Sequence, residues 1–195
     1  MRLKQEEVRE NRRKIIDTAG RLFRKRGFDG VGVAELMAAA GFTHGGFYNH
    51  FPSKEALATA ASAESLRRTN DGLAARLDHG GRSALRSYLG QYLSPWHRDH
   101  PDAGCTLAAL SADAGRQGRE VQESFAQGLR QVLSLTAGVL SGRGRRRKLE
   151  RAHQEALRTY SEIVGAIALS RAVKDADPAL SEEILAASRR ALVEA

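Results

Sequence analysis

Residues 34–57 read AELMAAAGFTHGGFYNHFPSKEAL, and this stretch decides the fold of the region around it. Its first part carries apolar residues at helical spacing and ends at Gly41, a residue type that commonly terminates helices. A second helix is expected to begin after Thr43, a suitable N-cap, and to end before Pro52. Two helices joined by the short turn AGFT make a helix-turn-helix, whose second helix enters the DNA major groove. The stretch therefore predicts a DNA-reading unit.

The second of these helices opens on two adjacent glycines, although each interior glycine costs about 1 kcal/mol relative to alanine. Without a Cβ atom, Gly45 and Gly46 would let the backbone approach DNA closely. Phe47 and Phe51 have i, i+4 spacing and are expected in the core of the three-helix unit. Tyr48 lies on a different face, so its hydroxyl could reach a phosphate or a base edge; packing in the core is the alternative for this residue.

The remaining chain shows helical periodicity and no β-branched run with period two. We therefore predict an all-α fold of about nine helices, with Gly27 ending the first helix and Ser53 capping the fourth. A break is expected at Gly80-Gly81, and a loop over residues 94–104. The predicted helices are residues 4–26, 33–40, 44–51, 53–77, 82–94, 106–114, 118–141, 147–174 and 179–193.

The chain has 195 residues, a formal net charge of +8 and one cysteine. The positive charge favours a polyanionic partner, with nucleic acid preferred over a membrane surface. Residues 1–55 hold 11 Lys and Arg against 7 Asp and Glu, and a second basic block covers residues 142–151, most simply a solvated connection. A lone cysteine fits a reducing cytosol. No signal peptide or membrane-spanning run is present, so we expect a soluble cytoplasmic protein without membrane contact.

The opening stretch, together with the preceding IIDTAGRLFRKRGFDG, resembles the signature of the TetR family of transcriptional regulators. The resemblance covers about residues 12–57. It implies a helix-turn-helix DNA-binding domain over residues 1–52 and a helical effector-binding and dimerisation domain over residues 53–195. The matching residues are Ala40, Gly41, Phe42, Thr43, Gly45, Phe47, Tyr48, His50, Phe51, Ser53, Lys54 and Leu57.

Carried over position by position, the resemblance also implies which residues contact a double-stranded DNA operator. These are Thr43, His44, Gly45, Tyr48, Asn49, His50 and Lys54. The start of the preceding helix, residues 32–34, lacks the Ser or Thr that the family usually has there. Base readout is therefore expected to fall mainly on His44 and Asn49, whereas capping or packing is the alternative for His50.

Four aromatic residues and the cysteine are candidates for an effector pocket, with bundle core as the alternative for the aromatic ones. The candidates are Tyr88, Tyr92, Trp96, Cys105 and Phe125. Cys105 precedes a predicted helix whose N-terminus could stabilise its thiolate, which makes it a candidate sensor of oxidants or electrophiles. A buried structural cysteine is the alternative. The expected effector is a small apolar or electrophilic molecule.

The segment HRDHPDAGC gathers His97, Asp99, His100, Asp102 and Cys105, but its spacing matches no structural zinc pattern. We therefore predict neither a metal site nor a cofactor. The sequence also lacks a nucleophile–base pairing and a phosphate-binding loop, so we do not expect an enzyme. A helical enzyme and a membrane-associated helical protein are the rival classes.

The last two predicted helices carry apolar residues at near-heptad spacing, and in the TetR family such a pair meets its symmetry mate. The expected dimer interface comprises Tyr160, Ile163, Ile167, Ile184 and Ala191. A two-fold homodimer implies a palindromic or near-palindromic operator. The resulting hypothesis is a repressor released when a ligand or thiol modification shifts the spacing of its DNA-binding ends. A regulator without a small-molecule effector is the alternative.

Overall fold

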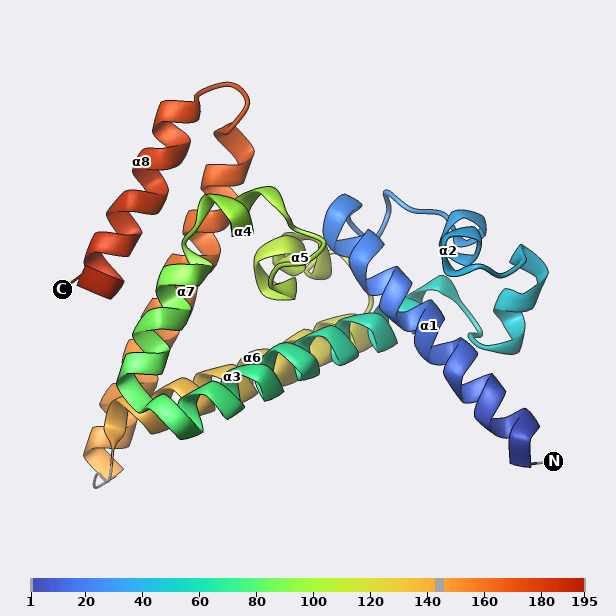
Figure 1. The fold of residues 1–195 in the computed structure, drawn as a ribbon, viewed down its shortest axis with the longest axis horizontal. Coiled ribbons are helices and arrows are strands. Elements are labelled where there is room, and N and C mark those ends of the chain that lie inside the picture. Colours follow the sequence, from blue (N-terminus) through green and yellow to red (C-terminus); the bar gives the residue numbers. More distant parts are fainter. Residues whose placement is uncertain (1, 143–145, 195) are drawn as a thin grey trace.

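The computed structural model describes residues 2–142 and 146–194, and every regular element within them is helical (Figure 1). The predicted all-α fold is confirmed. The helices are α1 (Arg2–Arg26), α2 (Val33–Ala40), the 3-10 helix η1 (His44–Asn49), α3 (Lys54–Tyr92), α4 (Pro95–Asp99), α5 (Thr106–Ala114), α6 (Arg119–Ser141), α7 (Arg146–Val173) and α8 (Pro178–Arg189). A π-helical turn, η2 (Arg190–Glu194), extends α8.

Helices α1, α2 and η1 pack together at one end of the molecule, on the right in Figure 1. Phe47 and Phe51 are buried there as predicted, with stacked rings whose centroids lie 5.9 Å apart. Gly27 ends α1 with φ 76°, and Gly41 ends α2 with φ 83°. Glycine suits both positions because it tolerates this left-handed backbone conformation without steric cost. The predicted helix ends are therefore confirmed.

The DNA-reading segment η1 is a 3-10 helix, whereas the sequence pattern predicted an ordinary helical segment. Thr43 occupies the N-cap position with an extended backbone, but its side chain makes no capping hydrogen bond. By contrast, Ser53 caps α3 as predicted, and its Oγ accepts a hydrogen bond from the Ala56 amide at 3.1 Å. The six residues of η1 lie between the turn at Gly41 and Pro52.

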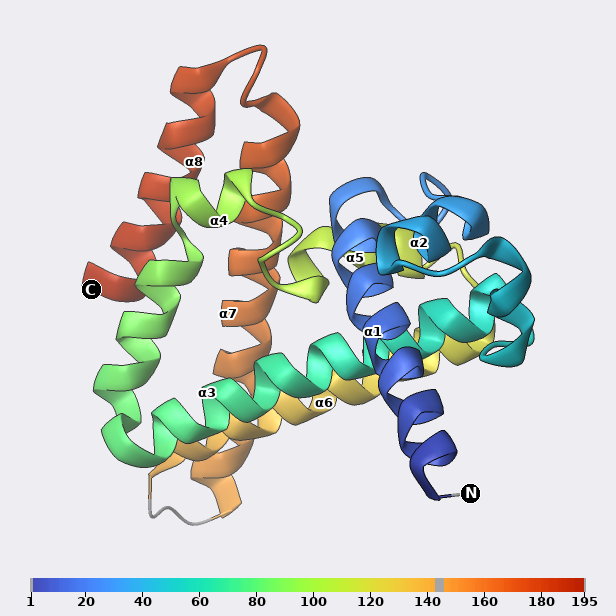
Figure 2. The same cartoon turned by 45° about the vertical axis from the view of Figure 1, so that its right-hand side comes forward.

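The break predicted at Gly80-Gly81 is confirmed, because α3 consists of two helical halves that meet there at a sharp kink. Gly81 has φ 49° and ψ −129° inside it, so the break is a kink that only a glycine adopts readily. The first half of α3 lies beside α6, and the second half turns toward α4 (Figures 1 and 2).

The loop predicted over residues 94–104 is wrong in part, because it contains the short helix α4. Ser94 caps α4 by accepting a hydrogen bond from the His97 amide at 3.2 Å, and Pro95 follows at the first helical position. A serine followed by proline is a recognised helix-start signal, so this helix could have been predicted.

Helices α7 and α8 form an antiparallel pair at the opposite end of the molecule from α2 (Figure 1). The buried Ser170 and Ser181 hydroxyls lie 2.8 Å apart and join the two helices. No helix in the described part of the chain has the length and apolar character that spanning a membrane requires.

Candidate nucleic-acid interface and effector cavity

The residues expected to contact DNA lie along η1 and its two flanks, at the end of the molecule away from α8 (Figure 1). Thr43, His44, Gly45, Tyr48 and Asn49 are exposed. The remaining two, His50 and Lys54, are half-buried.

Tyr48 is 67% exposed, so the alternative of a core tyrosine is wrong. Its ring meets the buried Phe47 edge-on, with centroids 5.2 Å apart and an interplanar angle of 84°. This contact fixes the ring against the core and leaves the hydroxyl at the surface. Tyr48 is therefore a rigid, exposed hydrogen-bonding group.

Neither glycine of η1 is required by the interior of the chain. A Cβ atom on Gly45 would meet nothing within 4 Å, and one on Gly46 would meet only Thr43 and Met37, at 3.7 and 3.8 Å. Neither glycine has a positive φ. Because packing and backbone conformation would both tolerate alanine, these glycines are consistent with close approach of an external molecule.

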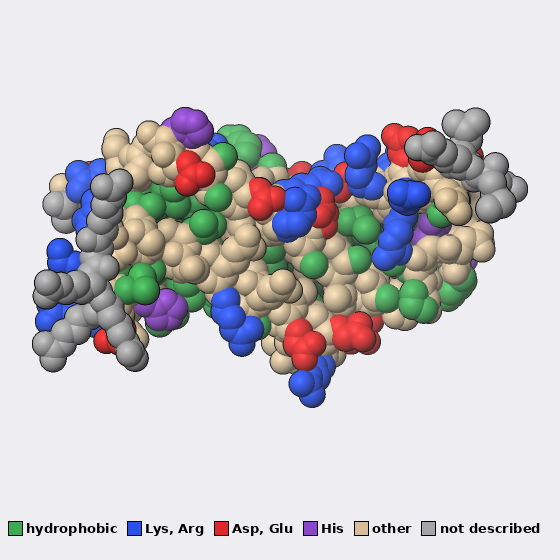
Figure 3. All heavy atoms as spheres, turned by 90° about the horizontal axis from the view of Figure 1, so that it is seen from below, with side chains coloured by type: hydrophobic (Ala, Val, Ile, Leu, Met, Phe, Trp, Pro, Cys, Tyr) green, Lys and Arg blue, Asp and Glu red, His purple; other side chains and the backbone are tan. Residues whose placement is uncertain are grey.

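Two basic residues of α1 support the end of η1 and were not singled out from the sequence. The Arg12 guanidinium lies 4.0 Å from the Phe51 ring centroid and donates to the His50 carbonyl. Lys14 lies 5.6 Å from the Phe42 ring centroid. Over the face seen in Figure 3, acidic and basic side chains are interspersed, so the basic excess is not concentrated there.

A cavity of about 490 Å³ lies between the two halves of α3, α4 and the turn before α5. We call it the effector cavity; its volume is typical of small-molecule sites. Four of the five expected pocket residues line it, whereas Phe125 of α6 is buried elsewhere. The lining residues are Thr69, Arg76, Tyr88, Gln91, Tyr92, Ser94, Trp96, His97, Ala103, Gly104 and Cys105.

Cys105 is 7% exposed and occupies the N-cap position of α5 without a side-chain capping bond. Its amide donates to Nε2 of His97 at 2.9 Å, and Nδ1 of His97 lies 2.8 Å from the Tyr92 carbonyl oxygen. These two bonds require a neutral imidazole with its proton on Nδ1. Burial lowers the pKa of His97, which favours that neutral form.

Tyrosine hydroxyls surround the cysteine. Burial raises the pKa of Tyr88 and Tyr92 well above the ordinary value, and the proximity of Cys105 raises both further. Burial likewise raises the pKa of Tyr160. These phenols therefore stay protonated and neutral. The Tyr160 hydroxyl interacts with Thr136 and Tyr88, and the Tyr92 hydroxyl interacts with Cys105, so buried polar groups lie close to the thiol.

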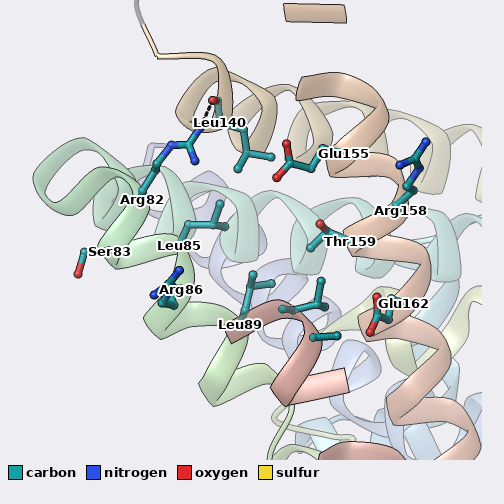
Figure 4. A pocket seen from close by; sticks show the side chains of 12 residues that line it. Arg82, Ser83, Leu85, Arg86, Leu89, Leu140, Glu155, Arg158, Thr159 and Glu162 are labelled. Carbon is teal, nitrogen blue, oxygen red and sulfur yellow. Dashed lines mark hydrogen bonds between the residues drawn. The ribbon is translucent and has the colours of Figure 1, made fainter. Parts of the chain in front are cut away.

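A second cavity of about 670 Å³ lies between the later half of α3, α7 and η2 (Figure 4). Leu85 and Leu89 form its apolar floor. Figure 4 shows Arg86 on one wall and Glu155 and Glu162 on the facing helix. Its rim is charged with both signs, and none of the expected effector residues lines it.

The structure corrects the predicted dimer interface. Tyr160, Ile163 and Ile167 are 3%, 0% and 0% exposed within a single chain, so they have no surface to offer a partner. Ile184 is half-buried and Ala191 is exposed. The apolar residues that α7 and α8 expose, at least in part, include Leu149, Leu157, Val164, Ala168, Leu169, Ala172, Val173, Ala179, Leu180, Ile184, Ala186 and Ala187, and Ala191 is exposed in η2.

The segment with several possible metal ligands has other contacts. Among the described residues, no three His, Cys, Asp or Glu side chains are placed to hold a metal ion. Hydrogen bonding from Arg98 lowers the pKa of Asp99 to about 2, and Lys174 lies 3.4 Å from the same carboxylate. The second basic block, residues 142–151, lies partly outside the described residues.

Residues 15–61 match the family model described as bacterial regulatory proteins, tetR family. The HTH-type transcriptional repressor NemR of Escherichia coli is 28% identical over 134 residues, which are 67% of each chain. The HTH-type transcriptional regulator TtgR of Pseudomonas putida is 40% identical over 74 residues, which are 38% of this chain and 35% of that protein. These similarities confirm the resemblance noted in the sequence.

Solved structures agree with the fold. The reduced form of E. coli NemR superposes with a TM-score of 0.76 and 24% identity, covering 95% of this chain and 96% of that one. A TetR-family regulator from Agrobacterium tumefaciens superposes with the same TM-score and 19% identity, covering 96% and 97%. These relatives are transcriptional regulators and not enzymes.

Proposed function

We propose that this chain is a DNA-binding transcriptional regulator of the TetR family, whose family model and relatives it matches, and that it is a dimeric repressor that leaves its operator when the effector cavity is occupied or Cys105 is modified. The observation that carries the DNA-binding part is the exposure of η1 with two glycines that nothing inside the chain requires. In this proposal residues 1–52 bind the operator, and residues 53–195 respond to the effector and dimerise.

The operator contacts follow from exposure and chemistry. His44 and Asn49 are exposed polar side chains that can bond base edges, whereas Thr43, Tyr48 and Lys54 are suited to phosphate oxygens. The backbone at Gly45 would approach the DNA closely. His50, whose carbonyl accepts a hydrogen bond from Arg12, would complete the interface.

The effector part rests on the effector cavity and its single thiol. Neutral phenols and a neutral imidazole surround Cys105, and Arg76, which also lines the cavity, donates a hydrogen bond to Gln91; we infer that the cavity takes a small molecule with apolar surface and hydrogen-bonding atoms. An electrophile with an activated carbon–carbon double bond could react there: the sulfur–carbon bond forms as the π bond breaks, and the neighbouring carbon takes up a proton in place of the one that the thiol loses. The solved E. coli NemR structure is that of a reduced form, which supports a thiol-dependent state in this chain as well.

The dimer would form through the exposed apolar faces of α7 and α8. On α7, Val164 and Ala168 lie at heptad-like spacing, and on α8 Leu180, Ile184 and Ala187 do the same. Two copies related by a two-fold axis would present two η1 segments, which favours a palindromic operator. An effector that binds better to one spacing of the DNA-binding ends would shift the population toward it.

Selection from random double-stranded oligonucleotides tests the proposal. We expect enrichment of a near-palindromic site, with affinity that falls steeply as salt rises. Tyr48→Ala and Lys54→Ala should each weaken operator binding by roughly tenfold or more. Leu129→Ala is the control, because it truncates a partly exposed apolar residue of α6, outside η1 and the effector cavity, and should leave operator affinity unchanged.

Tyr48→Phe tests the contribution of the hydroxyl to operator binding separately from that of the ring, since the phenylalanine ring can still make the edge-on contact with Phe47. If the purified protein enriches no sequence, or if Tyr48→Ala binds as tightly as the parent chain, the proposed interface is wrong.

A further inference from the structure

The turn that links α4 to α5, residues 100–105, separates the effector cavity from α1. Ala103 and Gly104 line the effector cavity and also a smaller cavity of about 260 Å³ beside α1. Cys105 lines the first cavity, and Arg24 of α1 lines the second. Only this turn therefore lies between the effector cavity at Cys105 and helix α1.

Arg24 holds this turn from the α1 side. Its Nε donates to the Asp102 carbonyl oxygen at 3.0 Å, its Nη2 donates to the same oxygen, and its Nη1 donates to Oγ of Ser65 at 2.8 Å. Burial lowers the pKa of Arg24, although an arginine this basic remains charged. Among the residues that the structure describes, no other side chain of α1 is hydrogen-bonded to the turn.

On the side opposite α1, the backbone of the turn is in close contact with α4. A Cβ atom on Gly104 would lie 2.6 Å from Nε2 of His97, and that same nitrogen accepts a hydrogen bond from the Cys105 amide. Helix α4 is itself held by Arg171 of α7, which donates to the Arg98 and His97 carbonyls at 2.9 and 3.2 Å. A larger group at Cys105 enters the effector cavity beside α4, so crowding there would displace the turn toward α1.

Helix α1 in turn supports η1, because Arg12 bonds the His50 carbonyl and covers the Phe51 ring. We propose that Arg24 is the positioning residue that couples the effector cavity to the DNA-binding helices. Its bonds to the Asp102 carbonyl set the position of α1 when the cavity is empty, and displacement of that carbonyl moves α1 and η1 together. This inference rests on the proposed function.

The single cysteine allows a defined perturbation without knowledge of the natural effector. Iodoacetamide alkylates the thiol: a sulfur–carbon bond forms, iodide leaves and the thiol proton passes to solvent. Mass spectrometry confirms complete reaction, and Cys105→Met supplies a larger side chain genetically as a second perturbation. Operator affinity is then measured for unmodified and alkylated protein.

We expect alkylation to weaken operator binding of the parent chain by about tenfold or more, within the usual range of allosteric coupling. In Arg24→Gln the same alkylation should weaken binding by less than about threefold relative to the unmodified variant, whose own affinity is measured as the reference. Arg24→Lys keeps the positive charge and one donor group. Alkylation should therefore weaken its operator binding by an amount between those for the parent chain and Arg24→Gln. If Arg24→Gln does not fold, Arg24→Lys takes its place in the test.

Arg21→Gln is the matched control, because Arg21 lies on the same helix and lines the same small cavity but bonds no residue of the turn. It should keep full coupling. Equal losses on alkylation in the parent and in Arg24→Gln would overturn the inference alone. An alkylated parent chain that keeps its operator affinity would instead overturn the proposed thiol response, and with it this inference.

Discussion

At the residue scale, His97 links three parts of the effector cavity. Its ring lies against Tyr92, with centroids 4.4 Å apart, and both ring nitrogens are engaged by backbone groups. Protonation would place a second N–H against the Cys105 amide, which is itself a donor. The contacts of the buried ring therefore favour its neutral form, and protonation at low pH should destabilise this part of the fold.

This leads to a pH prediction. The folded-state pKa of His97 lies below its ordinary value of 6.5, so the unfolded chain binds a proton more readily than the folded one. The stabilisation is complete above that ordinary value and is lost as pH falls from 6.5 through the folded pKa. The melting temperature should fall more between about pH 7.5 and about pH 5.5 in the parent chain than in His97→Gln.

Asp99 cannot mimic that effect. Its pKa is held near 2 instead of the ordinary 3.8, so its contribution is lost only at much lower pH. Identical pH profiles for the parent chain and His97→Gln would show that the ring is not the group responsible.

At the element scale, the crossing of α3 and α6 depends on a glycine. A Cβ atom on Gly128 would lie 2.8 Å from both Cβ and Cδ1 of the buried Leu66. At the same point, the Asn70 side-chain amide donates to the Gly128 carbonyl at 2.9 Å. The two helices are therefore in close backbone contact over a short length.

Gly128→Ala should reduce the free energy of unfolding by about 1–3 kcal/mol, since the added methyl group has no space. Gly138→Ala is the matched control on the same helix: nothing lies within 4 Å of its Cβ position. That variant should be neutral or up to about 1 kcal/mol more stable, because alanine favours the helix. Urea denaturation of both variants measures the difference, and equal stability changes would contradict the role of the crossing.

Other elements show how far local pattern reaches. The ends of α1 and α2 and the cap of α3 were predictable, because each depends on residues only a few positions apart. The break at Gly80-Gly81 was predictable too, because glycine permits the non-helical backbone found at Gly81, whereas the angle between the two halves of α3 depends on tertiary packing. Helix α4 was missed although its Ser-Pro start was present.

At the scale of the whole molecule, the open question is how two copies meet. Helix α7 carries two apolar stripes, and the structure buries the one containing Ile163 and Ile167 against its own core. The other stripe, with Val164 and Ala168, remains at least partly exposed and continues onto α8 at Leu180.

Ala168→Glu and Leu180→Glu should each weaken self-association by at least about tenfold, because a buried unpaired charge is costly at an interface. Sedimentation velocity over a concentration series measures the change. Leu129→Glu on α6 is the control, since it alters a partly exposed leucine outside the proposed face. Dimers of unchanged affinity in both α7 and α8 variants would place the interface elsewhere.

The sequence by itself determined the all-α class, most helix ends and the N-terminal helix-turn-helix, since helical periodicity, glycine caps and the helix-turn-helix spacing act over a few residues. It also indicated most of the effector cavity, because Tyr88, Tyr92, Trp96 and Cys105 are close along the chain. Only the tertiary structure decided which stripe of α7 is buried and that Arg24 holds the Asp102 carbonyl, 78 residues away. Such contacts depend on how helices pack, and local residue preferences do not specify that packing.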